Sequence, residues 1–208
     1  FKIDSLVKAT DYFIEKGYYV FRMGKFTEEK MNFKHKNFFD YANSDLRNDL
    51  NDILILSRCY LYLGSDSGIY TVADHFKTKV SFINFPSINF LGKYHFDKTS
   101  PSIFKMIKDV KTNRILSIKE MLKQKFDVSL NLNDLKNHNL QIISNSEKDI
   151  LNLAKEINDD YIIDKDEEIF LKEKLTNIFK DFCQYENLKD RVPNVSISFL
   201  KKNKFLLD

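Results

Sequence analysis

The chain has 208 residues, 43% of them hydrophobic and 30% charged, which is enough to bury the core of one larger domain or two small ones. Its 33 basic and 30 acidic residues are mixed along the sequence and leave a net charge of +3, so we do not expect the clustered basic face of a nucleic-acid-binding protein. No apolar run reaches about 18 residues and no signal peptide is visible, so we expect a cytoplasmic protein without a membrane-spanning segment.

The N-terminal stretch predicts a helix followed by a strand. Residues 4–16 carry apolar side chains at helical spacing, and Gly17 follows as a helix C-cap. The aromatic and β-branched residues 18–21 then predict a buried strand, which runs into Arg22 and Gly24.

A second strand and an amphipathic helix come next. Residues 37–41 predict a short strand that stops at Asn43 and Ser44, and either of these two residues is a suitable N-cap for a helix over 45–57. The apolar positions of this helix share one face, which we expect to pack on the core: Leu46, Leu50, Ile53 and Leu54.

Two further strands complete the predicted sheet. Residues 60–63 and 80–84 are apolar throughout, and a helix is predicted between them over 69–76. Strands that are apolar on both faces and alternate with helices are typical of a parallel sheet covered on both sides. The fold class we expect is therefore α/β, with a Rossmann-like parallel sheet, helices on both of its faces, and further helices at the C-terminal end.

The pattern is weaker between about 86 and 138, which we interpret as an insertion in a single domain over 1–208. Ser117 and Glu120 form a capping-box pattern within it. Residues 140–143 predict a fifth strand of the sheet.

A C-terminal helical part follows over about 146–208. Asn145 or Ser146 is expected to cap a helix that ends near residue 158, and a longer amphipathic helix is predicted over 166–187. The tail from residue 195 to 207 carries enough apolar residues to dock. The long helix is expected to face inward with Ile169, Phe170, Leu175, Ile178, Phe179 and Phe182.

Small and polar residues follow the predicted strands, and in an open parallel sheet ligands bind outside these carboxyl ends. Two of the five glycines of the chain, Gly64 and Gly68, stand in a single five-residue turn at the start of a helix. Glycines let the backbone approach a ligand closely, and free N–H groups at a helix start favour an anion such as a diphosphate. The predicted binding residues are Arg22, Gly24, Asn43, Ser44, Gly64, Ser65, Asp66, Ser67 and Gly68.

Two other interpretations of this turn stay open. A plain strand-to-helix turn favours the same residue types without any ligand. The spacing is also that of the G-x-S-x-G nucleophile elbow, but Asp66 occupies its central position, so a serine hydrolase does not fit and an aspartate nucleophile would need His95 or His138 as its base.

No metal site is predicted. Cys59 and Cys183 are far apart and are expected to be reduced thiols packed as small hydrophobic residues. The histidines lack the spacing of metal ligands: His35, His75, His95 and His138.

Several blocks of the sequence resemble a family of bacterial glycosyltransferases from surface-polysaccharide gene neighbourhoods. The specific part is GYYVFRMGK, then DYANSDLRNDLNDILILSRCYLYLGSDSGIYTVADHF, then VSFINF. The later stretches IISNSEKDILNLAKEIND and ISFLKKNKFLL are also similar, so that the resemblance covers nearly the whole chain. The wider likeness is to the carboxy-terminal half of GT-B enzymes such as heptosyltransferases.

This resemblance implies a donor-binding domain for a nucleotide sugar, with Ser65 to Gly68 at the diphosphate, Arg22 and Gly24 beside it, and Asn43 with Ser44 at the rim. Family members often carry Thr-Gly where this chain has Asp66, so the role of that residue departs from the pattern. The class implies no cofactor and no metal, because N–H groups and cations stabilise the departing diphosphate.

The resemblance also implies partners and alternatives. The acceptor, a glycan or lipid-linked molecule, and the usual catalytic base belong to an amino-terminal domain that this chain lacks, so the chain alone is expected to bind donor weakly and to catalyse nothing. The basic end Lys201 to Lys204 is a candidate for peripheral contact with the inner membrane. The alternatives are a GT-B-type sugar-nucleotide 2-epimerase and a non-catalytic α/β interaction module.

Overall fold

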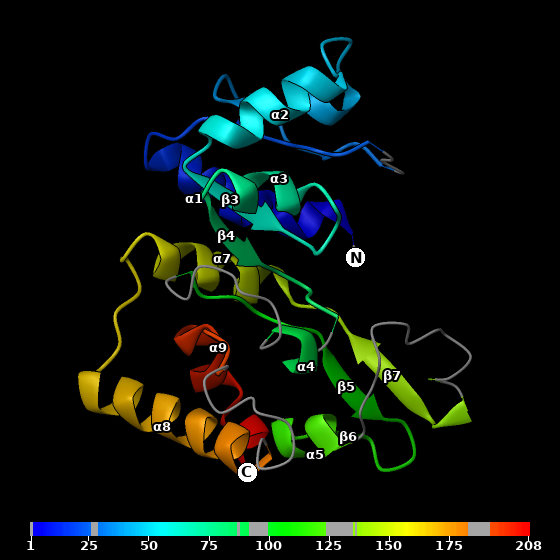
Figure 1. Ribbon diagram of the computed structural model, residues 1–208, viewed down its shortest axis with the longest axis vertical. Helices are drawn as coiled ribbons and strands as arrows, with labels where there is room; N and C mark the ends of the chain where they lie inside the picture. Colours follow the sequence, from blue (N-terminus) through cyan, green and yellow to red (C-terminus); the bar gives the residue numbers. More distant parts are fainter. Residues whose placement is uncertain are drawn as a thin grey trace.

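The computed structural model describes residues 2–25, 29–86, 88–91, 100–123, 135, 137–182 and 192–208. It is a mixed α/β protein in which helices predominate and the strands form small sheets. Figure 1 shows α2 at one end of the molecule and α8 with the C-terminus at the other. Among the described residues, no helix combines the length and apolarity needed to cross a membrane.

The first helical segment matches its prediction and its cap. A 3-10 turn, η1 (Ile3–Leu6), leads into α1 (Val7–Glu15), and Gly17 follows with a φ of 89°. The N–H of Tyr18 donates to the carbonyl of Phe13 at 3.0 Å, which is the bond that closes a helix over a left-handed glycine. The local sequence therefore ends this helix as expected.

Two separate pairs of parallel strands occupy the middle of the chain. β1 (Val20–Phe21) pairs with β2 (Phe38–Phe39), and β3 (Leu61–Gly64) pairs with β4 (Lys79–Phe82). Single parallel bridges extend the second pair, because Phe85 bridges to Phe104 and Ser102 bridges to Val195. The expected four-stranded parallel sheet is therefore not observed as one sheet: two parallel pairs are present, and no ladder joins β1 to β3 in the described part of the chain.

Three helical segments connect and cover these strands. They are η2 (Tyr41–Asn43), α2 (Asp49–Arg58) and α3 (Tyr70–His75). The predicted cap of α2 was wrong, because residues 41–43 form the 3-10 turn η2, and Asn48 caps α2 by accepting from the N–H of Asn51 at 2.9 Å.

The apolar face of α2 does not pack on the core as predicted. The residues predicted for this face are 43–65% exposed, namely Leu50, Ile53 and Leu54 in α2 and Leu46 in the turn before it. Leu56 is the buried residue of this helix, and its carbonyl accepts from the hydroxyl of Thr78 at 3.1 Å. The apolar periodicity was identified correctly, but the face that it defines is directed away from the core.

The second half of the chain builds an antiparallel sheet. β5 (Met106–Asp109) lies between β6 (Arg114–Ile115) and β7 (Leu140–Ile143), and it is antiparallel to both. The strand predicted over 140–143 is therefore present, but it is not a fifth parallel strand.

Five further helical segments complete the described chain: α4 (Ile88–Leu91), α5 (Ile118–Lys123), α7 (Glu147–Ile157), α8 (Lys165–Phe182) and α9 (Ile197–Lys202), followed by η4 (Lys204–Leu207). Two predicted caps are confirmed. Ser117 and Glu120 form the capping box of α5, and Ser146 with Asp149 forms that of α7. The tail docks as predicted, because the carboxylate of Glu156 accepts the N–H groups of Ile197 and Ser198 at 2.8 and 3.0 Å.

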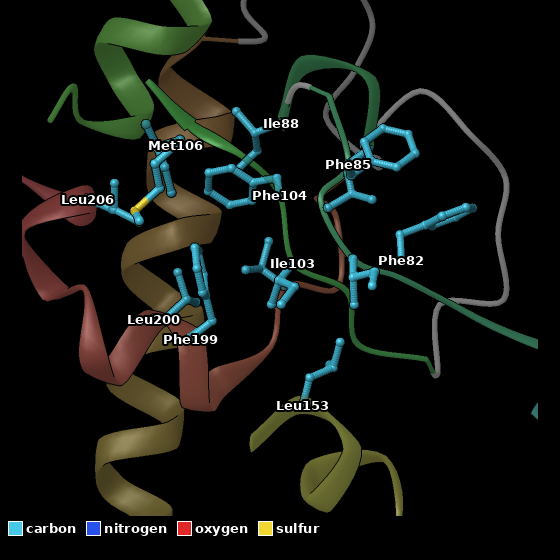
Figure 2. Packing of buried hydrophobic residues seen from close by; sticks show 14 of the residues in the cluster. Phe82, Phe85, Ile88, Ile103, Phe104, Met106, Leu153, Phe199, Leu200 and Leu206 are labelled. Atoms are coloured by element: carbon cyan, nitrogen blue, oxygen red, sulfur yellow. The ribbon is translucent and has the colours of Figure 1, made fainter. Parts of the chain in front are cut away.

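The core lies where β4, β5, α7 and α9 meet. Figure 2 shows Phe104 between Ile88 and Ile103, whereas the rings of Phe82 and Phe85 lie on the right, on the side away from Phe199. The rings of Phe104 and Phe199 are 5.3 Å apart in an edge-to-face arrangement, which is a favourable aromatic contact. Residues of the segment 102–107, within the predicted insertion, belong to this core.

The long helix α8 buries part of the predicted face. Leu171, Leu175, Ile178 and Phe179 are buried, whereas Ile169 and Phe170 are more than half exposed. The prediction for Ile169 and Phe170 was wrong, since the buried stripe is centred nearer the end of the helix. The side chain of Phe182, also predicted to face inward, lies outside the described part of the structure.

Candidate functional site

A cavity of about 680 Å³ lies between the two parallel halves of the sheet. Its walls are β1 on one side, the end of α2 with β3 on the other, and α1 beneath. We call this cavity the slot. It extends to the carboxyl ends of β1 and β3, the position at which parallel sheets bind their ligands.

The slot brings together five of the nine residues predicted from the sequence: Arg22, Gly24, Gly64, Ser65 and Ser67. These residues come from two segments more than 40 positions apart, and the fold places both segments on the same cavity. The carboxyl ends of β1 and β3 therefore border the same cavity.

The other four predicted residues are not part of the cavity wall. Asp66 and Gly68 are exposed in the same turn. The side-chain amide of Asn43 donates to both carboxylate oxygens of Asp40 at 2.9 Å, and the hydroxyl of Ser44 donates to the carbonyl of Tyr41 at 2.9 Å. Asn43 and Ser44 thus hold the 3-10 turn after β2.

Arg22 is held firmly at the edge of the slot. Its Nη1 donates to the carboxylate of Asp40 at 3.3 Å, its Nη2 donates to the carbonyl of Glu29, and its side chain is only 8% exposed. A guanidinium has five N–H donors, so these two bonds leave others for a ligand. The neighbouring carboxylate offsets part of the positive charge of Arg22. Arg22 would therefore act on a ligand mainly through directed N–H donors and less through its net charge.

Gly24 follows Arg22 with a φ of 145°, in the region that favours glycine. Its carbonyl accepts from Nε of Arg47 at 3.2 Å, and Nη2 of Arg47 lies 3.5 Å from the carboxylate of Asp52. The backbone after β1 is therefore fixed by α2 and by the loop before it.

The turn after β3 is organised by Tyr62. Its hydroxyl donates to the carbonyl of Ser65 at 3.0 Å and lies 3.3 Å from Oγ of Ser67. Burial raises the pKa of Tyr62 to about 12, so the phenol keeps its proton at neutral pH. A Cβ at position 64 would stand 2.7 Å from this hydroxyl. Glycine at position 64 therefore avoids a clash with the side chain of Tyr62.

Gly68 has a different environment from Gly64. A Cβ at position 68 meets no atom within 4 Å, so the backbone there is open to a ligand. The next helix contributes little anion affinity of its own, because α3 has six residues and the N–H groups of Tyr70 and Thr71 already donate to the carbonyls of Ser67 and Gly68. The anion donors of this turn are the serine hydroxyls and the N–H groups before α3.

The remainder of the slot wall is apolar and aromatic, which the sequence reasoning missed. Tyr18 and Tyr60 form a tilted ring pair at 5.7 Å, with Phe13 in edge contact with Tyr18 at 5.6 Å. Tyr19 and Phe21 also contribute to the wall and are 72% and 45% exposed. The aromatic run was interpreted as a buried strand. Nothing in the sequence shows that these side chains are exposed on a cavity, because their exposure depends on the tertiary structure.

Cys59 is a free thiol on the slot wall, and burial raises its pKa, so it is not an activated nucleophile. His35, His75 and His138 are exposed, while His95 and Cys183 lie outside the described residues. No group of three potential metal ligands occurs in the described parts of the chain. The predicted bases for an aspartate nucleophile are thus not brought to Asp66 by anything that the structure describes.

Comparison with known proteins gave no relatives. No family model matches the chain, and neither a curated protein nor a solved structure is significantly similar to it. The geometry of the slot and the chemistry of its residues are therefore the basis for a functional proposal.

Proposed function

We propose that the chain is the donor-binding domain of a GT-B-type glycosyltransferase, which binds a nucleotide sugar for transfer to a bacterial cell-surface glycan. The observation that carries the proposal is the slot, in which Arg22 and Gly24 from one strand end meet Gly64, Ser65 and Ser67 from another. A cavity with a polar end and aromatic walls suits a ligand that has both a charged group and a planar ring.

The polar end of the slot offers donors for a diphosphate. Ser65 and Ser67 carry hydroxyl groups, and the backbone at Gly68 is open for close approach. Arg22 adds N–H groups whose direction is fixed by Asp40. Hydrogen bonds to a charged acceptor are stronger than neutral ones, and orientation in advance lowers the entropy cost of binding.

The aromatic walls offer a surface for the nucleobase. Tyr18 and Tyr60 present ring faces and edges to the slot, and aromatic rings pack favourably on one another at such distances. A slot volume of about 680 Å³ is within the usual range for small-molecule sites, roughly 300–1,000 Å³.

The proposal includes a Rossmann-like parallel sheet in the order β2, β1, β3, β4. Both observed pairs are parallel, and isolated parallel bridges continue beyond β4, from Phe85 to Phe104 and from Ser102 to Val195. In this arrangement the slot occupies the position where β1 and β3 would be neighbours.

The transfer reaction needs a second domain. The acceptor hydroxyl oxygen forms a bond with the anomeric carbon of the sugar, the bond from that carbon to the diphosphate breaks, and a nucleoside diphosphate leaves. The hydroxyl proton passes to a base that we expect on the acceptor-binding domain. The role of the present chain is to hold the donor and to stabilise the leaving diphosphate through Ser65, Ser67 and Arg22.

Isothermal titration calorimetry with UDP-glucose, GDP-mannose, CMP-N-acetylneuraminate and ADP-glucose tests this proposal. We expect one of the four to bind, and Ser67→Glu to weaken that binding at least about tenfold, because a carboxylate would repel the diphosphate. Ser57→Glu is the matched control, since Ser57 is on α2 outside the slot wall.

Equal affinities of the two variants, with melting temperatures unchanged, would contradict the assignment of the turn after β3. Failure of all four nucleotide sugars to bind the wild-type chain would contradict the proposed function itself.

A further inference from the structure

The two halves of the parallel sheet face one another across the slot. β1 pairs with β2 on its far side, and β3 pairs with β4 on its far side. Residues 18–24 and 58–65 form the facing walls of the cavity. The facing edges of β1 and β3 therefore carry no partner strand in the described chain, although both strands line the slot.

Strand geometry identifies which backbone groups face the slot. In a parallel ladder, successive residues direct their N–H and C=O groups to opposite sides. Val20 and Arg22 donate to the carbonyls of Asn37 and Phe39, so these residues face β2. The groups of Phe21, between them, consequently face the slot.

The same alternation applies to β3. The carbonyl of Gly64 accepts from the N–H of Ile83 at 2.9 Å, so Gly64 and Tyr62 direct their groups to β4. Leu61 and Leu63 then direct theirs into the slot. Backbone polar groups in an apolar cavity are unfavourable unless they are paired, and these are placed to pair with the groups of Phe21.

The apolar side chains around the slot are also poorly covered. Tyr19, Phe21, Leu54 and Tyr60 belong to the slot wall and are 43–72% exposed. Contiguous exposed apolar surface of this kind indicates a contact that the observed conformation does not make. An approach of β1 toward β3 would cover these side chains and pair the backbone groups together.

We propose that nucleotide-sugar binding closes the slot by pairing β1 directly with β3, converting the two parallel pairs into one sheet. This inference rests on the proposed function, because the bound diphosphate supplies the link between the two strand ends. Arg22 and Gly24 belong to the moving half, whereas Ser65 and Ser67 belong to the other half. An anion held by both halves binds the closed state better than the open one, which is the condition for a ligand to shift the equilibrium.

We call β1, β2 and η2 the moving half. The covalent and hydrogen-bonded connections within it favour a hinge motion. β1, β2 and η2 are tied together by the Arg22–Asp40 pair and by the bond from Ala42 N–H to the Arg22 carbonyl at 2.9 Å. Arg47 joins the start of α2 to Gly24. β1, β2 and η2 can therefore approach β3 as one body, while the end of α2 stays with the other half through the bond from the Thr78 hydroxyl to the Leu56 carbonyl.

Backbone amide exchange measured by NMR tests the closure. In the free protein, the amides of Phe21, Leu61 and Leu63 should exchange at least about tenfold faster than those of Val20, Arg22 and Tyr62, whose N–H groups are paired. Addition of the nucleotide sugar that binds in calorimetry, among UDP-glucose, GDP-mannose, CMP-N-acetylneuraminate and ADP-glucose, should slow the first three amides to the rates of the second three.

Phe21→Pro removes one N–H group that faces the slot and leaves the bonds to β2 in place, since proline is tolerated on a strand edge that lacks a partner. We expect this variant to keep its melting temperature, to bind the nucleotide sugar at least about fivefold more weakly, and to lose the ligand-induced protection of Leu63. If the variant does not fold, the exchange rates of the wild-type protein decide the question.

The outcomes separate the two proposals. Ligand binding without slower exchange at Phe21, Leu61 and Leu63 would overturn the closure and leave the proposed function intact. Slow exchange of these amides in the free protein would also overturn it, because the strands would then already be paired. No binding of any of the four probes would overturn the proposed function.

Discussion

The region around the slot and the region around β5 use apolar side chains in opposite ways. In the core of the second region, Phe82, Phe104 and Phe199 are at most 1% exposed, and the rings of Phe104 and Phe199 are in edge-to-face contact. Around the slot, Leu50 and Leu54 of α2 are 65% and 43% exposed. The first pattern is that of a scaffold whose packing is complete, and the second is that of a surface that becomes covered only when another contact forms.

The exposed apolar side chains of α2 are also consistent with a ligand site, because incomplete packing leaves volume for a substrate. A cavity whose walls already packed on each other would have no volume for a substrate. The slot retains volume because β1 and α2 are held mainly by polar contacts at Arg22, Arg47 and Asn48. This difference between the two regions can be tested by substitutions that act on one region and spare the other.

The largest expected effect is in the core. Phe104→Ala should lower the free energy of unfolding by about 3–5 kcal/mol, because it removes a fully buried ring that packs on Phe199. Leu50→Ala should change it by less than about 0.5 kcal/mol, since that side chain is mostly exposed. Urea denaturation measures both, and similar losses would mean that α2 is packed in solution.

A polar network in the core should have the next largest effect. The side-chain oxygen of Asn145 accepts from the N–H of Asn84 at 2.6 Å, and its amide donates to the carbonyl of Phe104 at 2.8 Å. Asn145→Ala leaves both buried backbone groups without partners and should cost about 3 kcal/mol of unfolding free energy. Asn152→Ala on α7 is the control, expected within about 0.5 kcal/mol, and an equal loss from both would contradict the role of the network.

The two glycines of the turn after β3 provide a matched pair next to the slot. Gly64→Ala places a Cβ 2.7 Å from the hydroxyl of Tyr62 and should destabilise the protein by about 1–3 kcal/mol. Gly68→Ala meets open space and should be nearly neutral, within about 0.5 kcal/mol. Thermal denaturation distinguishes them, and a reversed order would show that Tyr62 does not cover Gly64.

The smallest effect is on the surface of the second region and depends on pH. Hydrogen bonds from the Arg114 guanidinium, with help from the N–H of Ser117, lower the pKa of Glu120 from 4.5 to about 2. Because the pKa is lower in the folded state, the contribution to stability is complete above pH 4.5 and disappears as the pH falls toward 2. Glu120→Gln should therefore cost less than about 1 kcal/mol at pH 7, since the pair is partly exposed, and nothing near pH 2.

Arg114→Gln removes the other partner of this ion pair and serves as the comparison. The two single losses should not add in the double variant, because both remove the same interaction. A stability difference that stays constant between pH 7 and pH 2 would contradict the assignment.

Local features of the fold were predictable from the sequence because they depend on neighbouring residues. The capping boxes at Ser117 and Ser146 and the helix end at Gly17 are confirmed. Each is fixed within a few residues of chain, and the physical cause is a hydrogen bond or a backbone angle that the residue type itself determines.

Features that depend on distant contacts were predicted less well. Periodicity showed that Leu50 and Leu54 share a face of α2, but it carries no information about what that face contacts. β7 was predicted as a strand, but its antiparallel pairing with β5 depends on contacts between segments that are distant in the sequence. Similarly, five of the nine predicted site residues reach the slot, whereas the aromatic wall at Tyr18 and Tyr60 was missed because aromatic runs also occur in buried strands.

The central claim is that the carboxyl ends of β1 and β3 form one binding site, and a map of backbone chemical shifts upon addition of a nucleotide sugar tests it most directly. The account predicts that the largest shifts occur together in residues 22–24 and 64–68, on opposite walls of the slot. Shifts confined to the second region, in residues 102–123 and 140–208, would contradict it.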